Sequence, residues 1–394
     1  MQRPAAADRS EAVFQAVLAL WRQRLAENAP LPPGLGEYNS AFPWAQVKRG
    51  LAALVQPIVT PPNLGAGGQK YDRRVLALVC AGNTPLLAWP AMLFAVRYGV
   101  PLFVKMSRSE TLWPRLLKES VEEVSPEAGA KIELGVWPGE DERTEKLVEL
   151  SDAAIAYGSD KTIERLKNFA GEKPFLGFGH ALSVGIWRNQ PVPGRINDWV
   201  AWMFDQGAQF ALDAMLFDQS GCLSPQVFFV EGVGRRNISE AAFDALGLEL
   251  NQPSDDLFDV GPRQDAALCR KIREIQDLAR MGGAKVRSDS GLRWTVIQWP
   301  ENSIFPEVFG AGLFHLIPLD DLTKFGKFLG PAKGRISSVG VAGEITPELR
   351  AAIEAEGVSR ICRAGEMQTP PLNWRNGGVD LEAWIAGLRQ RETS

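Results

Sequence analysis

Cys222 is the residue in this sequence best suited to covalent chemistry. It lies in the short polar segment 219–225 (QSGCLSP), which separates a long apolar stretch from an apolar run. Gly221 leaves space beside the thiol, and Pro225 stiffens the chain where it leaves the segment. A nucleophilic sulfur must be reachable, and backbone N–H groups must face the oxyanion that forms when it attacks a carbonyl. The segment therefore predicts a catalytic thiol, although an unreactive loop cysteine has the same local pattern.

Asn83 follows the first apolar run of a predicted sheet, in the segment 81–85 (AGNTP). Ligands of open α/β sheets bind at the carboxyl ends of the strands. The side-chain amide of Asn83 could donate a hydrogen bond to a substrate oxygen there, or it could cap the helix that follows. The sequence leaves both interpretations open.

Two further polar groups also come directly after predicted strands. Lys105, Ser107 and Arg108 place two cations and a hydroxyl within four residues, which suits a phosphate group, although solvated surface charge explains them as well. Gly158 and Ser159 end another strand and open a helix. A pyrophosphate could bind at that helix N-terminus, and an ordinary Ser159 N-cap is the alternative.

Short apolar runs alternate with amphipathic stretches over the first half of the chain. The expected strands are 75–80, 102–105, 131–136, 152–157 and 174–178, and the expected helices are 86–98, 111–123, 141–150 and 160–169. Apolar strands with crossover helices between them indicate a parallel sheet. The pattern predicts a doubly wound α/β domain of the nucleotide-binding type.

A second α/β region of similar construction follows a linker rich in Pro, Gly and Asn at 188–197. Its expected elements are a helix at 199–216 and strands at 227–231, 294–299, 313–318 and 336–341. We therefore expect four parts: a mainly helical segment 1–70 ending in a glycine-rich loop (63–70), a nucleotide-binding α/β domain 71–190, a catalytic α/β domain 191–375 that carries the cysteine, and a C-terminal helix or tail 376–394.

Composition and charge exclude several classes of protein. The 394 residues are 45% hydrophobic and 23% charged, with a net charge of −4, which attracts neither nucleic acid nor an anionic membrane. The most apolar stretch, 85–104, is interrupted by Arg97 and Pro101, so no membrane span is expected. Four widely spaced cysteines and no signal-peptide pattern indicate a cytoplasmic protein with free thiols. With only His180 and His315 available, we expect no metal site and no Ser-His-Asp triad.

Taken in order, these segments resemble the aldehyde dehydrogenase superfamily, and within it the acyl-CoA reductase branch typified by LuxC. The resemblance runs from about residue 75 to residue 380. Segment 219–225 carries the best match, and segments 360–362 (RIC) and 365–372 (GEMQTPPL) add support. The resemblance implies an aldehyde-dehydrogenase-like fold of two α/β domains with parallel-type sheets and an active site in the cleft between them.

The resemblance also implies roles for individual residues. Cys222 matches the family nucleophile, and Asn83 matches the asparagine that completes the oxyanion hole with the backbone N–H of that cysteine. Lys105 matches the lysine that reaches the adenosine ribose, and Gly158 with Ser159 matches the glycine-serine pair beside the pyrophosphate. In the segment 307–310 (EVFG), Glu307 resembles the glutamate that holds the nicotinamide ribose, and Phe309 belongs to the same cofactor-binding element.

Two departures from the aldehyde-oxidising pattern point to reduction and to NADP(H). In oxidising enzymes a general-base glutamate activates the water that hydrolyses the thioester. That glutamate should fall near Gly177, in the segment 176–180 (LGFGH), where no carboxylate is present. An acyl-cysteine should therefore persist. Arg108 stands where NAD-selective members place a glutamate, and an arginine there should attract a 2′-phosphate. NADP(H) is the expected cofactor, with NAD(H) as the alternative.

We therefore expect an acyl-CoA reductase that converts a fatty acyl thioester into an aldehyde, through an S-acyl bond to Cys222 and hydride from NADPH. The alternatives are a CoA-acylating aldehyde dehydrogenase running in the oxidative direction, a non-catalytic acyl-binding subunit of a reductase complex and, with less support, an acyl-phosphate reductase. The resemblance implies an acyl-transferring partner enzyme, and we expect a homo-oligomer. His180 is expected to be a structural histidine, with proton donation as the alternative.

Overall fold

The computed structural model describes residues 6–27, 29–32, 34–35, 40, 42–58, 75–189, 199–232, 238–251 and 262–388. The chain forms two compact units: unit 1 is Met1–His180 with Thr369–Ser394, and unit 2 is Ala181–Gln368. The C-terminal segment thus belongs to the same unit as the N-terminal half. The glycine-rich segment 63–70 and most of the linker 188–197 lie outside the described residues. The division into functional domains stays a prediction.

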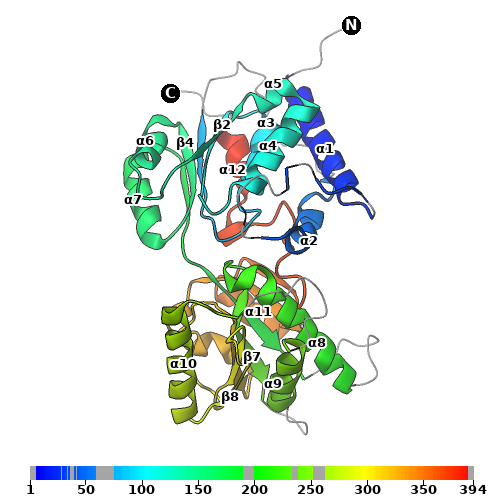
Figure 1. Ribbon diagram of the computed structural model, residues 1–394, viewed down its shortest axis with the longest axis vertical. Coiled ribbons are helices and arrows are strands. Elements are labelled where there is room, and N and C mark those ends of the chain that lie inside the picture. Colours follow the sequence, from blue (N-terminus) through cyan, green and yellow to red (C-terminus); the bar gives the residue numbers. More distant parts are fainter. Residues whose placement is uncertain are drawn as a thin grey trace. The chain divides into compact units, whose positions relative to one another are not determined.

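Unit 1 is built on a parallel sheet of five strands in the order β3-β2-β1-β4-β5 (Figure 1). The strands are β1 (Leu76–Val79), β2 (Leu102–Met106), β3 (Ile132–Val136), β4 (Ala153–Tyr157) and β5 (Phe175–Phe178). The chain moves outward from β1 through β2 to β3 and then returns to β4 on the other side of β1. The strand order therefore reverses beside β1, which is where open α/β sheets bind ligands.

Helices cover both faces of this sheet. They are α1 (Ala6–Arg24), α2 (Trp44–Leu54), α3 (Trp89–Tyr98), α4 (Leu112–Val124), α5 (Pro126–Gly129), α6 (Arg143–Leu150), α7 (Asp160–Ala170) and α12 (Leu381–Leu388). Helices α6 and α7 lie side by side and bury Val148 and Leu166 against β1 and β4 (Figure 1). The facing positions of the strands are mostly alanine, which lets the two helices approach the sheet closely.

Arg97 on α3 fastens both ends of the chain into unit 1. Its side chain is completely buried and forms 2.7 Å ion pairs with Glu11 of α1 and with Glu382 of α12. The hydroxyl of Tyr98 donates a 2.9 Å hydrogen bond to Glu382. Because removing one partner of a buried ion pair typically costs about 3–5 kcal/mol, this cluster explains why the C-terminal helix belongs to unit 1.

Unit 2 contains a sheet of seven strands in the order β12-β11-β6-β7-β10-β9-β8. The strands are β6 (Leu182–Trp187), β7 (Pro225–Glu231), β8 (Lys285–Ser288), β9 (Thr295–Gln298), β10 (Leu313–Leu319), β11 (Ile336–Ala342) and β12 (Arg360–Arg363). All neighbouring pairs are parallel except the edge pair of β8 and β9, which is antiparallel. The α/β class expected from the sequence, with two largely parallel sheets, is confirmed.

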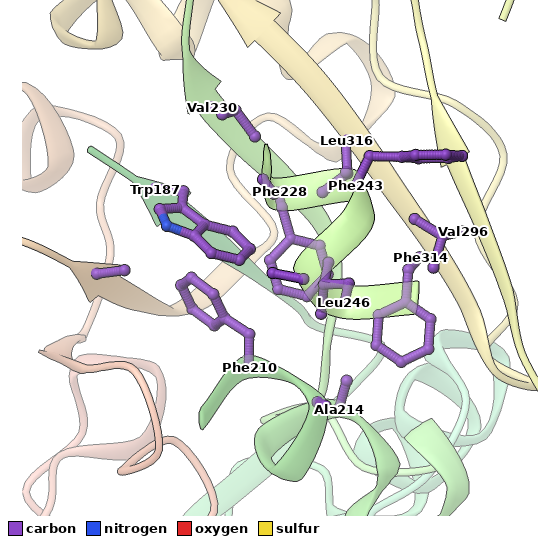
Figure 2. Close-up of a cluster of buried hydrophobic side chains, with 14 of the residues drawn as sticks. Trp187, Phe210, Ala214, Phe228, Val230, Phe243, Leu246, Val296, Phe314 and Leu316 are labelled. Carbon is purple, nitrogen blue, oxygen red and sulfur yellow. The ribbon is translucent and has the colours of Figure 1, made fainter. Parts of the chain in front are cut away.

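The core of unit 2 has a layer on each face of its sheet. Figure 2 shows one of them, in which Phe210 of α8 (Trp199–Met215) and Leu246 of α9 (Ile238–Glu249) pack against Phe228 of β7 and Phe314 of β10. The opposite face packs against α10 (Ala266–Met281), α11 (Pro347–Ala355) and the 3-10 helix Leu322–Phe328. Among the described residues, no helix is both long and apolar enough to cross a membrane.

Candidate active site

The turn that leads to Cys222 has an unusual backbone. Helix α8 ends at Met215, and Phe217, Asp218 and Gln219 then have φ values of 60°, 50° and 55°. Residues other than glycine rarely adopt this left-handed backbone region, and each one that does costs of order 1–3 kcal/mol of conformational free energy. A run of three, ending three residues before the predicted nucleophile, is the kind of strain that clusters at functional sites.

Side chains of unit 2 hold this turn in place. Gln219 is buried, and its Nε2 donates to the backbone oxygens of Pro225 at 3.3 Å and Leu313 at 3.0 Å. The carboxylate of Asp218 forms a two-pronged ion pair with the guanidinium of Arg263. These contacts join the turn to the ends of β7 and β10, and they compensate for its backbone strain.

Ser183 and Ser224 fix Cys222 from two sides. The hydroxyl of Ser183, at the start of β6, donates a 2.6 Å hydrogen bond to the backbone oxygen of Cys222. Gln368 donates from Nε2 to Ser224 Oγ at 2.8 Å and to the backbone oxygen of Asp213 at 2.7 Å. The cysteine-bearing turn is therefore tied both to a central strand and to the segment 365–368.

Asp213 of α8 holds segment 365–368 by hydrogen bonds. Its carboxylate is completely buried and accepts hydrogen bonds from the backbone N–H groups of Gly365 at 2.6 Å and Met367 at 3.0 Å. Gly365 has φ 85°, and any side chain at this position would overlap the amide of Gln209. Segment 365–368 thus supports the cysteine turn through α8 and through Ser224.

The pKa of Cys222 differs from that of most reactive cysteines. Cysteines that act as nucleophiles usually have a pKa lowered below about 8.5. In the structure, burial raises the pKa of the Cys222 thiol to about 11, and the hydrogen bond from its own backbone N–H opposes this only in part. Cys222 is therefore a predominantly neutral thiol at pH 7.

The segment with Glu307 and Phe309 packs against the cysteine turn within unit 2. Gly310 has φ 76°, and a Cβ there would lie 3.1 Å from the backbone oxygen of Gln219. The backbone N–H of Gly310 donates to Gln226 Oε1 at 2.7 Å. The segment 307–310, which contains two predicted site residues, therefore contacts the turn that leads to Cys222.

Lys271 of α10 contacts both predicted residues of the 307–310 segment. Its Nζ lies 2.8 Å from the carboxylate of Glu307, and it also lies 4.2 Å from the centre of the Phe309 ring. Sequence reasoning did not single out Lys271, because it lies on an ordinary amphipathic helix far from the segment it contacts. Glu307 is exposed, with 69% of its side chain accessible, and so can exchange this ion pair for another partner.

In unit 1, Asn83 follows the central strand β1 and is exposed at the carboxyl edge of the sheet. Helix α3 begins at Trp89, and its N-cap residue Ala88 makes no side-chain cap. The capping interpretation of Asn83 is therefore not realised, since the helix starts too far along the chain. Ligand donation by Asn83 stays a prediction.

The neighbouring strand β2 brings its polar end against the same loop. Ser107 Oγ lies 3.0 Å from Ser109 Oγ, and a side chain at Gly82 would overlap both hydroxyls. The backbone N–H of Cys80 donates to the oxygen of Lys105 at 2.9 Å, which fixes the two strand ends in register. The structure thus gathers Asn83, Ser107 and Lys105 at one edge and adds Ser109, which the sequence analysis missed.

Lys105 is the buried cation of this edge, with 5% of its surface exposed. Burial lowers its pKa, and the nearby charge of Arg108 acts in the same direction. The carboxylates of Glu140 and Asp141, on the loop after β3, oppose this shift. The two acidic residues are unforeseen neighbours of the predicted phosphate-binding cations.

Ser159 is the N-cap of α7. Its Oγ accepts a 3.2 Å hydrogen bond from the backbone N–H of Thr162 and lies 2.9 Å from Thr162 Oγ1. The ordinary capping interpretation is therefore correct, and it leaves the helix dipole available to an anion. Lys105 and Arg108, the hydroxyls after β2 and this helix terminus form a donor set that fits the phosphates and ribose of a nicotinamide dinucleotide.

Neighbouring side chains fill the space beside Gly177, the position where the sequence lacks a general base. A side chain at Gly177 would overlap Ile163 of α7, and one at Gly179 would overlap the carboxylate of Asp160. Asp160 accepts a 2.8 Å hydrogen bond from the backbone N–H of His180. Across the described parts of the chain, no group of three or more His, Cys, Asp or Glu residues could hold a metal ion.

Several solved structures of other proteins have a fold similar to that of this chain. The chain is similar in fold to an indole-3-acetaldehyde dehydrogenase from P. syringae solved in complex with NAD+ and IAA, with 16% identity, a TM-score of 0.65, and 96% of this chain and 80% of that chain covered. It is also similar to an oxidoreductase from Marinobacter aquaeolei, with 12% identity, a TM-score of 0.67 and coverage of 98% and 85%. A NAD-dependent benzaldehyde dehydrogenase from Corynebacterium glutamicum gives 14% identity, a TM-score of 0.65 and coverage of 98% and 84%.

At the level of sequence, no curated protein matches the chain. The family described as acyl-CoA reductase (LuxC) matches residues 69–382, which include all of the site residues discussed above. Since that match covers most of the sequence, the protein belongs to the acyl-CoA reductase (LuxC) family.

Proposed function

We propose that the protein reduces a fatty acyl thioester, such as an acyl-CoA, to an aldehyde through an S-acyl bond to Cys222. The observation that carries the proposal is the position of Cys222: it follows the left-handed run at 217–219 by three residues, Ser183 holds its backbone oxygen, and the Ser224–Gln368 contact holds the segment after it. A cysteine that only fills a loop needs no such support.

Cys222 performs the first step as a nucleophile. Its sulfur attacks the acyl carbonyl, a carbon–sulfur bond forms, and the bond to the departing thiol breaks, so that the thiol leaves with a proton and Cys222 carries the acyl group. The backbone N–H of Cys222 and the side-chain amide of Asn83 stabilise the oxyanion in this step. The thiol must lose its proton beforehand, because its raised pKa keeps it neutral at rest.

We further propose that unit 1 holds NADP(H), with NAD(H) as the alternative cofactor. Lys105, Ser107 and Arg108 would hold the adenosine ribose and its 2′-phosphate, and Gly158 with Ser159 would hold the pyrophosphate at the start of α7. In unit 2, Glu307 and Phe309 would hold the nicotinamide end. When bound, this cofactor supplies the hydride that reduces the acyl group on Cys222.

The packing at Gly177 supports reduction over hydrolysis. The general base expected there in oxidising enzymes is absent, and Ile163 occupies the space that its side chain would need. Without a base to activate water, the acyl group stays on Cys222 until it is reduced or transferred to another thiol. A homo-oligomer in the cytoplasm that receives its acyl group from a partner enzyme is consistent with this chemistry and is part of the proposal.

Incubation of the protein with an acyl-CoA without cofactor, followed by mass spectrometry, tests the proposal. We expect a mass increase of one acyl group, lost in Cys222→Ala and retained in Cys269→Ala. Cys269 is a suitable control because it is another free, partly exposed cysteine of unit 2. No acyl mass on the parent protein, or equal labelling of the Cys222→Ala variant, would contradict the proposal.

A further inference from the structure

The loop between β3 and α6 brings charged residues to the predicted phosphate-binding edge of unit 1. Strand β3 pairs with β2 so that Gly135 lies beside Lys105 and Val136 beside Met106. The chain that leaves β3 therefore passes next to the turn that carries Arg108. Glu140 and Asp141 lie on this loop, at the start of α6.

Arg143 engages Asp141 with a fixed geometry. Its Nε donates to Asp141 Oδ1 at 2.9 Å, its Nη2 donates to Oδ2 at 2.7 Å, and its backbone N–H also donates to Oδ1 at 2.9 Å. The guanidinium lies 5.1 Å from the centre of the Trp137 ring, and Trp137 is itself held by a 2.8 Å hydrogen bond from Nε1 to Thr144 Oγ1. Contacts with the Trp137 ring and with the backbone at the start of α6 therefore hold the Asp141–Arg143 ion pair in place.

The charge of Asp141 acts on the predicted cofactor cations. Its carboxylate interacts electrostatically with both Lys105 and Arg108, and Glu140 interacts with Lys105. A carboxylate close to these cations would weaken their attraction for a phosphate dianion, because a carboxylate and a phosphate carry like charges and repel. The bidentate ion pair with Arg143 offsets the negative charge of Asp141.

We propose that Arg143 is a specificity-determining residue, which neutralises Asp141 so that the Arg108 turn accepts a 2′-phosphate and not only a ribose hydroxyl. Arg143 acts through Asp141 and Arg108 without forming a bond to the substrate. The inference rests on the proposed use of a nicotinamide cofactor, and it extends that proposal by naming the pair that sets its phosphate preference.

Calorimetric titration with adenosine 2′,5′-bisphosphate and adenosine 5′-monophosphate tests this inference, since the two ligands differ only in the 2′-phosphate. We expect Arg143→Gln to weaken binding of the bisphosphate about twofold to fivefold at low salt, the range typical of exposed charges, and to change binding of the monophosphate less than about 1.5-fold. The double variant Arg143→Gln with Asp141→Asn should recover the affinity for the bisphosphate. Lys146→Gln, which removes an exposed cation from the same helix, is the matched control and should leave both affinities unchanged.

Three results would overturn the inference: no loss in Arg143→Gln, an equal loss for both ligands, or no recovery in the double variant. The loss should also shrink in concentrated salt, where exposed charges are screened, and a loss unaffected by salt would contradict an electrostatic role. A parent protein that reduces an acyl-CoA but binds the two nucleotides equally defeats this inference alone. A parent protein that binds neither nucleotide and reduces no acyl thioester defeats the proposed function as well.

Discussion

The hydroxyl of Ser183 donates a 2.6 Å hydrogen bond to the backbone oxygen of Cys222. Ser183 lies in β6, an inner strand of the seven-stranded sheet, and Cys222 follows the left-handed run at 217–219, so the bond attaches the cysteine-bearing turn to the sheet of unit 2. It also fixes the plane of the Cys222–Leu223 peptide, to which this carbonyl belongs. Precise placement of donors is what makes an oxyanion site effective.

Removal of the Ser183 hydroxyl should impair the chemistry more than substrate binding. We expect Ser183→Ala to slow acylation of Cys222 about tenfold, with little change in KM, and to lower the free energy of unfolding by about 1–3 kcal/mol, because the Cys222 oxygen loses its partner. Stopped-flow release of the CoA thiol measures the rate. Ser337→Ala is the matched control: Ser337 is a buried serine of β11 whose hydroxyl has no hydrogen-bond partner among the described residues. An equal rate loss in both variants would contradict the role of Ser183.

Asp213 should be essential to the structure of unit 2. The variant Asp213→Asn keeps the size of the side chain but replaces one acceptor oxygen with a donor, which then faces the backbone N–H of Gly365 or Met367. We expect a loss of about 2–3 kcal/mol in the free energy of unfolding, measured by urea denaturation, together with slower acylation. Asp277→Asn, on the exposed side of α10, should cost less than about 0.5 kcal/mol. Similar losses in the two variants would contradict the anchoring role.

The reactivity of Cys222 should rise steeply with pH. Its pKa is raised to about 11 by burial, so the thiolate is only about one part in ten thousand at pH 7 and increases about tenfold per pH unit up to that pKa. We expect the rate of alkylation of Cys222 by iodoacetamide in the cofactor-free protein to follow this slope between pH 7 and pH 10. A plateau reached below pH 8 would show that another group lowers the pKa, contrary to the structure.

Asn83 should contribute to the reaction as an oxyanion donor. Loss of one such donor typically costs about a hundredfold or more in rate, so Asn83→Ala should slow turnover by that order. The melting temperature should change little, because Asn83 is exposed and α3 begins without its side chain. Thr84→Ala, at the neighbouring position, is the control and should retain most of its activity. An unchanged turnover in Asn83→Ala would remove this residue from the site.

Much of the fold could be predicted from the sequence because its strands are apolar on both faces. All five strands of unit 1 were expected within a few residues, and β1 and β4 are buried along their whole length. Strand β6 was missed, since Ser183 and Gly185 interrupt its apolar pattern and the linker obscures its end. The antiparallel edge strand β8 was also missed, because its polar residues give no apolar run.

The candidate reactive residues could be named from the sequence, but the residues that contact and support them could not. Cys222 stands out by its local segment, whereas Ser183 is 39 residues away and Met367 is 154 residues from Asp213. Contacts over such separations depend on the packing of the sheet and leave no local pattern. One signal was available: Asp213 is an acidic residue in the otherwise apolar stretch that forms the end of α8, which is typical of a buried charge with a specific partner.

A single-turnover chase decides whether the acyl group on Cys222 becomes the aldehyde. The protein is first acylated with an acyl-CoA, separated from free CoA and then mixed with NADPH, while the aldehyde and the mass of the protein are followed. We expect about one aldehyde per acylated Cys222, with the protein returning to its original mass. Release of the free acid, or loss of the acyl group at the same rate without NADPH, would contradict it.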